Sequence, residues 1–240
     1  MRDSVTGSVT GAMATSTSVR PRQLALALAH SESFAREDFL AGSSNQTALD
    51  LIAQWPDWPG RNVALVGPAG SGKSHLAAIW AAEAGARTVT ARALDEPMLP
   101  TAVATGALVV EDLTPDQLDE RALFHLLNLA REQDVSLLLT ARTPPASWAI
   151  ALPDLASRLR AVPVVPLASP DDSLLRAILV KLFADRQLAV DESLVGFLVT
   201  RIERSLAAAR DAVDMIDREA LRQGRPATRA LAAELIRGRL

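Results

Sequence analysis

The chain has 240 residues, of which 49% are hydrophobic and 22% are charged, so it can bury the core of one large or two small globular domains. Its net charge of −3 lacks the basic balance of duplex-DNA and membrane-surface binders, which favours protein partners. There is no cysteine, which excludes disulfides, zinc thiolate sites and thiol catalysis. With neither a membrane-spanning apolar run nor a signal-peptide pattern, we expect a cytoplasmic protein.

Residues 1–19 consist mainly of Ser, Thr, Gly and Ala, with almost no large apolar side chains. Such a composition does not repay the entropy of ordering, so we expect a disordered tail. Residues 20–30 follow as a separate short segment, which contains Gln23-Leu24-Ala25-Leu26-Ala27-Leu28. Taken alone, this pattern is typical of an ordinary strand or of the start of a buried helix.

The most specific motif lies between an apolar run, Asn62 to Val66, and a helical pattern that starts at His75. There Gly67-Pro68-Ala69-Gly70-Ser71-Gly72-Lys73-Ser74 fits the phosphate-binding loop G-x-x-x-x-G-K-[ST]. Its glycines let backbone N–H groups surround the β- and γ-phosphates, Lys73 is expected to reach their oxygens, and the Ser74 hydroxyl is expected to ligate Mg²⁺. A glycine-rich surface turn is the plainer alternative. We predict a site for ATP or ADP with Mg²⁺.

The rest of the chain alternates strand and helix patterns up to about residue 166. Strands are predicted at 62–66, 87–91, 107–112, 135–140 and 162–165, and a helix start is predicted at Thr114, with Pro115 and Gln117 completing its cap. This alternation predicts an α/β domain over residues 31–166, with a five-stranded, mostly parallel sheet covered by helices. From Ser169-Pro170-Asp171-Asp172 onward only helices are expected, forming a small lid domain over residues 167–240.

Two carboxylates, Glu111 and Asp112, end the third predicted strand. In a phosphate-loop protein such residues hold Mg²⁺ and orient an attacking water, and the pattern is that of a Walker B strand. The plainer alternative is a solvated acidic strand end. Thr140 ends the next strand, where its hydroxyl could contact the γ-phosphate or the water.

A short helical segment before the last strand carries two arginines, Arg158 and Arg160, within Asp154-Leu155-Ala156-Ser157-Arg158-Leu159-Arg160. An arginine here in an AAA+ module projects across a subunit boundary and stabilises the transition state at a neighbour's γ-phosphate. Arg158 is our first choice for this catalytic arginine finger and Arg160 the second. A surface arginine in an ion pair is the alternative.

Together, Trp55-Pro56-Asp57-Trp58-Pro59, Gly72-Lys73-Ser74-His75-Leu76 and Ser157-Arg158-Leu159 resemble the AAA+ module of the DnaA family, and in particular its shorter, Hda-type members. The resemblance covers roughly residues 20–238. It implies an AAA+ P-loop NTPase core with a helical lid, and it places Phe39, Leu40 and Asn45 around the adenine base. The chain stops where the lid helices stop, so we expect no specific DNA binding of its own.

Hda-type proteins bind the sliding clamp, the β subunit of DNA polymerase, through an N-terminal peptide that Gln23, Leu24, Leu26 and Leu28 resemble. The resemblance therefore implies clamp binding and stimulation of hydrolysis of DnaA-bound ATP, which represses replication initiation. A homo-oligomer is left open. The sensor arginine of the family's lid is replaced by Ala207 here, with Arg204 and Arg210 nearby as substitutes. Alternatives are a helicase loader, which binds a helicase and single-stranded DNA, and a small-molecule kinase.

Overall fold

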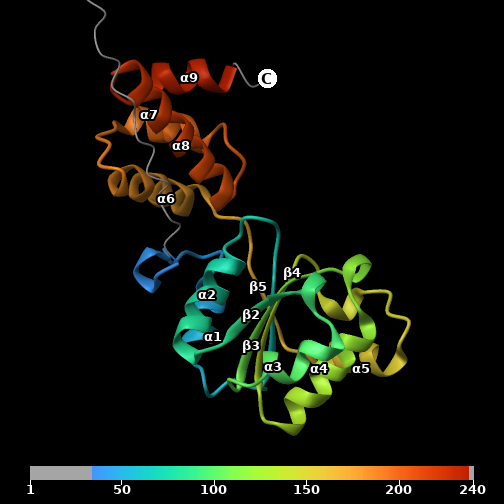
Figure 1. Cartoon of the computed structure of the whole chain (residues 1–240). Coiled ribbons are helices and arrows are strands. Elements are labelled where there is room, and N and C mark those ends of the chain that lie inside the picture. The colour runs from blue at the N-terminus through green and yellow to red at the C-terminus, as the bar shows by residue number, and fades with distance from the viewer. Residues whose placement is uncertain (1–33, 238–240) are drawn as a thin grey trace, which may run out of the picture.

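The computed structural model describes residues 34–237, which form an α/β part and a helical part joined after β5 (Figure 1). The predicted tail and clamp-binding segment lie outside these residues. All strand pairings in the α/β part are parallel, in the order β2-β3-β4-β1-β5. The strands are β1 (Asn62–Val66), β2 (Arg87–Thr90), β3 (Ala107–Leu113), β4 (Ser136–Ala141) and β5 (Val164–Pro166).

Helices cover both faces of the sheet. Alternate residues of one strand belong to two different apolar cores: Val63 and Leu65 of β1 lie in one, and Ala64 and Val66 lie in the other. This two-sided burial explains why the strands are continuously apolar. One face carries α1 (Gln46–Ala53) and α2 (Lys73–Ala84), and the other carries α3 (Leu99–Ala102), α4 (Glu120–Glu132) and α5 (Pro153–Ala161). The predicted α/β fold class is confirmed.

The helical part has a core of its own, which includes the fully buried Phe183. Its helices are α6 (Asp172–Asp185), α7 (Glu192–Val199), α8 (Leu206–Gln223) and α9 (Arg229–Arg237). At the predicted start of α6, Asp171 accepts a hydrogen bond from the Leu174 backbone N–H at 2.8 Å and another from the Ser43 hydroxyl at 2.8 Å. Bonds to the Leu174 N–H and to the Ser173 and Ser43 hydroxyls lower the pKa of Asp171 to about 2. Asp171 therefore joins the helical part to the segment before α1.

Two local predictions were wrong. Residues 115–117 form only a 3-10 turn, and the Thr114 side chain makes no capping bond; α4 instead starts after Asp119, whose carboxylate accepts from the N–H groups of Arg121 and Ala122. A carboxylate that satisfies two free N–H groups is the better helix cap. The last strand starts at Val164 because Pro163, which has no N–H, interrupts the apolar run from Val162.

No helix among residues 34–237 is long and apolar enough to cross a membrane.

Candidate nucleotide site

The predicted phosphate-binding loop connects the end of β1 to the start of α2. Gly70 and Gly72 adopt φ angles of 70° and 100°, which glycine reaches without strain. Ser71 is buried, whereas Pro68, Ala69 and Ser74 are exposed. The loop therefore has the strand-turn-helix context that the motif needs in order to bind phosphate.

Lys73 opens α2 with its side chain folded against the loop. Its Nζ donates to the carbonyl oxygens of Gly67 and Pro68, both at 2.8 Å. Burial lowers the pKa of Lys73; the charges of Asp112 and Glu111 oppose this shift, and the charge of Arg142 adds to it. These charges therefore lie together around the Lys73 ammonium group.

A β-bulge shapes the acidic end of β3. Val110 pairs with Leu139 and Leu113 pairs with Ala141, so Glu111 and Asp112 together face one β4 residue, Thr140. The Asp112 backbone has a φ of 57°, and its N–H donates to the Thr140 hydroxyl at 3.0 Å. Thr140 is thus a positioning residue for the bulge, a role that the sequence did not indicate.

The residues of this edge fit a phosphate group with Mg²⁺. Two buried side-chain oxygens, Ser71 Oγ and Glu111 Oε1, have no hydrogen-bond partner. Asp112 and Ser74 are exposed beside them. Residues 34–237 contain no cluster of three His, Cys, Asp or Glu side chains suited to a metal. Mg²⁺ bound with a nucleotide takes few protein ligands and completes its shell with phosphate and water.

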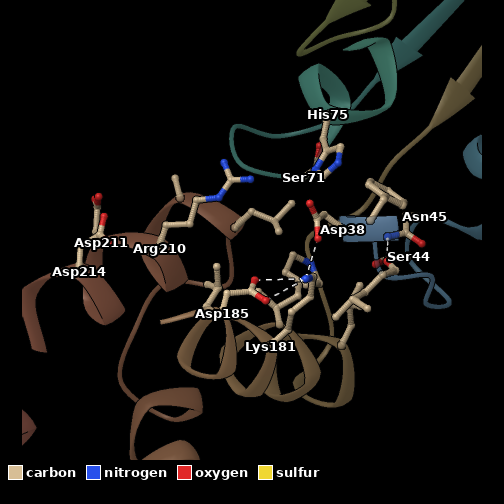
Figure 2. Close-up of a pocket in the computed structure, with 18 of the residues that line it drawn as sticks. Asp38, Ser44, Asn45, Ser71, His75, Lys181, Asp185, Arg210, Asp211 and Asp214 are labelled. Carbon is tan, nitrogen blue, oxygen red and sulfur yellow. Dashed lines mark hydrogen bonds and ion pairs between the residues drawn. The ribbon is translucent and has the colours of Figure 1, made fainter. Parts of the chain in front are cut away.

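A cavity of about 430 Å³ extends from the loop to the helical part (Figure 2). Ser71 and His75 line it from the loop side, and Lys181 and Arg210 line it from α6 and α8. The segment before α1 supplies a third wall, which includes Asp38, Phe39, Leu40, Ser44 and Asn45. The cavity has the size and mixed lining of a small-ligand site.

Phe39, Leu40 and Asn45 all line this cavity, in different ways. The buried Phe39 ring meets the His75 ring edge to face at 5.2 Å, which ties the segment to α2. Asn45 accepts from the Gly42 N–H at 2.8 Å and donates to the Leu40 carbonyl at 3.0 Å. Because the oxygen and the nitrogen of its side-chain amide both form hydrogen bonds with the backbone of this segment, Asn45 shapes the wall of the cavity.

The lid arginine that faces the cavity is Arg210. Figure 2 shows its side chain extending from α8 towards the phosphate-loop side, and its guanidinium lies 6.0 Å from the Phe34 ring centre. Arg204 is exposed and pairs with Asp172 at 2.8 Å, outside the lining. Ala207, which also lines the cavity, contributes no charge.

The helical part also contacts the loop directly. The Leu206 N–H at the start of α8 donates to the Gly70 carbonyl at 2.9 Å. A Cβ added at Gly70 would lie 2.5 Å from Ser205 Cβ, which is closer than such atoms approach. Gly70 therefore allows α8 to approach the loop.

We expect Gly70→Ala to destabilise the protein more than Gly106→Ala. Both positions have positive φ, at 70° and 77°, so both variants carry a backbone cost of about 1–2 kcal/mol. Only Gly70→Ala adds the collision with Ser205, because Gly106 has open space around its added Cβ. Urea unfolding measures the two free energies of unfolding. Equal losses would contradict the close approach of α8 to the loop.

Arg158 lies at the amino-terminal ends of β1 and β5, whereas the phosphate loop follows the carboxyl-terminal end of β1. On α5, it borders a cavity of about 210 Å³ with Gly60 just before β1, Asn62 at the start of β1 and Pro163 just before β5. Its guanidinium carbon lies 5.4 Å from the Phe124 ring centre. The phosphate loop follows the other end of β1, five residues at about 3.3 Å each, so Arg158 does not approach it. Arg160 is exposed on the same helix.

Sequence reasoning did not single out Arg142, which follows β4 and whose charge contributes to lowering the pKa of Lys73. The sequence did contain a signal for this position, because Arg142 is a charged residue two positions after Thr140, the candidate nucleotide contact at the end of the predicted strand.

No family model matches the sequence. A Sinorhizobium fredii protein that bears the name of an insertion sequence ATP-binding protein is 35% identical over 133 residues, which cover 46% of this chain and 44% of that protein. The chain spans about half the length of the curated relatives it matches.

Similarity to solved structures extends over most of the chain. Domain III of the Thermotoga maritima replication initiation protein DnaA matches with a TM-score of 0.70 and 18% identity, over 85% of this chain and 96% of that one. Aquifex aeolicus DnaA bound to AMPPCP matches with a TM-score of 0.63 and 16% identity, over 80% and 67%. The Thermotoga maritima RuvB Holliday junction branch migration motor matches with a TM-score of 0.67 and 16% identity, over 84% and 70%. The chain therefore shares its fold with DnaA domain III and with RuvB.

Proposed function

We propose that this chain is an AAA+ protein that binds ATP or ADP with Mg²⁺ and promotes hydrolysis of a nucleotide held by a partner. The observation that carries the proposal is the position of Arg158, at the end of the sheet opposite its own phosphate loop. The Arg158 guanidinium is a permanent, planar cation that can stabilise the charge of a phosphate in the transition state. From this end of the sheet it would reach a nucleotide bound by an adjacent molecule. The chain's own nucleotide then acts mainly as a conformational switch.

We further propose DnaA as the partner and the DNA-loaded sliding clamp as the platform. Support comes from the Hda-type motif around Arg158, from the Gln23 to Leu28 pattern and from the fold shared with DnaA domain III. An extended peptide can present the Gln23 amide to one pocket of a clamp groove and bury Leu26 and Leu28 in another. In this role the protein converts DnaA to its ADP form and represses repeated initiation.

The experiment that tests this role follows hydrolysis of radiolabelled ATP prebound to DnaA, with the clamp loaded on DNA. Wild-type protein is expected to accelerate hydrolysis only when clamp is present, and Gln23→Ala is expected to lose most of the acceleration because the peptide no longer docks. Gln54→Ala, at an exposed glutamine after α1, is the matched control and should behave as wild type. No acceleration by folded, nucleotide-bound wild-type protein would refute the DnaA role.

A second candidate is a helicase-loader-like ATPase, with which the fold and the ATP-binding name of the matched Sinorhizobium fredii protein are also compatible. Such a protein would bind a replicative helicase and single-stranded DNA without needing the clamp. Deleting residues 20–30 separates the two candidates. The clamp-dependent regulator loses its function on deletion, whereas the loader keeps helicase and single-stranded DNA binding.

A further inference from the structure

The helical part carries two arginines around one phenylalanine ring, at the end that Figure 1 shows pointing away from the sheet, where α7 and α9 lie. The Arg201 guanidinium lies over the Phe197 ring of α7 at 4.2 Å, and the Arg229 guanidinium of α9 lies over it at 5.6 Å. Because both distances run to the same ring centre, the two guanidinium carbons are no more than 9.8 Å apart. None of the three residues lines the large cavity, so this Phe197 cluster is separate from the candidate nucleotide site.

Nearby carboxylates offset the charge of the Phe197 cluster only in part. Within residues 34–237, neither Arg201 nor Arg229 has a carboxylate at ion-pair distance. Asp191 has its pKa lowered mainly by hydrogen bonds from the Ser193 hydroxyl and the Leu194 N–H, and the charge of Arg229 adds to this shift. The Asp191 carboxylate is therefore near Arg229 but is engaged in capping α7. Glu203, two residues after Arg201, is exposed.

The connection between α8 and α9 extends the positive charge. Residues 220–233 contain three arginines and no acidic residue. Arg222 pairs with Glu219, whereas the exposed Arg225 donates to the Gln223 side-chain oxygen at 2.9 Å. Arg225 and Arg229 are four residues apart, so their Cα atoms are separated by at most about 14 Å. Since the whole chain has a net charge of −3, this basic end is a local feature that the overall balance conceals.

The chemistry of the Phe197 cluster fits a phosphodiester backbone better than it fits bases. The Phe197 ring is partly buried and has both guanidinium groups over it, so it does not offer a free face on which a base could stack. Guanidinium groups bind phosphate oxygens through paired N–H donors. Duplex DNA carries about one negative charge per 1.7 Å of its axis, so two arginines this close can both meet phosphates of one duplex.

We propose that Arg201 and Arg229, with Arg225 beside them, contact the backbone of duplex DNA without reading its sequence. The inference goes beyond the proposed function and does not depend on the nucleotide site. Two or three phosphate contacts give weak binding by themselves. For a protein that another contact already holds on DNA, the effective concentration of the duplex is high, and a weak contact then orients the molecule.

Fluorescence anisotropy of a labelled, random-sequence duplex tests the inference with the whole chain, over about 50 to 200 mM NaCl. For the double variant Arg201→Gln with Arg229→Gln, we expect affinity at the lowest salt to fall by about 10-fold. The slope of log affinity against log salt should become shallower by about 2, one for each lost phosphate contact. The double variant Arg201→Lys with Arg229→Lys should keep most of the affinity, because lysine binds phosphate as a point charge.

The matched control is Arg87→Gln with Arg131→Gln, which removes the same charge from exposed positions on β2 and α4. It should stay within about twofold of wild type, because charges far from the bound duplex are screened by salt. Circular dichroism establishes that each variant is folded.

Three results would overturn the inference: no salt-dependent binding of folded wild type to the duplex, equal losses in the two Gln double variants, or a loss confined to single-stranded DNA or to phosphatidylserine vesicles. Equal losses would mean that net charge alone drives binding. A loss confined to vesicles would assign the Phe197 cluster to a membrane surface instead. Because the assay contains no nucleotide, clamp or DnaA, none of these results bears on the proposed function.

Discussion

Lys73→Ala is expected to weaken the binding of Mg²⁺-ATP and Mg²⁺-ADP by about 100-fold or more. The ammonium group is the main side-chain charge of the phosphate loop, and no other lysine or arginine lies within the loop. Lys73 now donates to the Gly67 and Pro68 carbonyls, and a phosphate offers it oxygens with full negative charge. Titration calorimetry with both nucleotides measures the loss.

The same variant has a matched control in Arg131→Ala, which removes one positive charge from the exposed face of α4. Circular dichroism establishes that Lys73→Ala is folded. Near wild-type affinity in a folded Lys73→Ala protein would mean that the loop does not bind phosphate.

Arg158→Ala is expected to remove nearly all stimulation of DnaA-bound ATP hydrolysis, because an arginine finger contributes about 10³-fold or more to such a reaction. Its own nucleotide affinity should not change, since Arg158 lies beyond the far end of β1. Arg158→Lys should recover only part of the stimulation, because lysine lacks the planar fork. The measurement is hydrolysis of labelled ATP on DnaA with loaded clamp.

Arg160→Ala, on the same helix, is the informative comparison. It should retain stimulation if Arg158 is the finger, and it should lose stimulation if Arg160 is the finger. Clamp binding is measured in parallel so that a docking defect is not mistaken for a catalytic one. Full stimulation by an Arg158→Ala protein that still binds clamp would remove Arg158 from the mechanism.

Much of the fold could be predicted because its signals are local. Runs such as Ala107 to Val110 are apolar at every position since both faces of the strand are buried, and the glycine-rich loop marks the junction of β1 with α2. Element ends were less predictable. At Thr114 the sequence offers a good cap, and only the structure reveals that Asp119 supplies the bonds that start α4.

The site was predictable where one segment carries it, as in the phosphate loop, and less so where distant segments meet. The bulge that turns Asp112 onto Thr140 depends on the register of β3 against β4. Arg142 lies near the phosphate loop because β4 is the neighbour of β1 in the sheet. Strand order is a property of the whole fold, so the sequence did not reveal this position. The two hydrogen bonds of the Asn45 side-chain amide likewise depend on the conformation of the loop that they close.

The ion pair between Asp38 and Lys181, at 2.7 Å, joins the segment before α1 to α6 across the large cavity. If a nucleotide binds in this cavity, as we propose, it touches both walls, and its release then depends in part on how often this contact opens. On that proposal, contacts to the phosphates mainly set the affinity for a nucleotide, and the ion pair between the walls mainly sets its residence time.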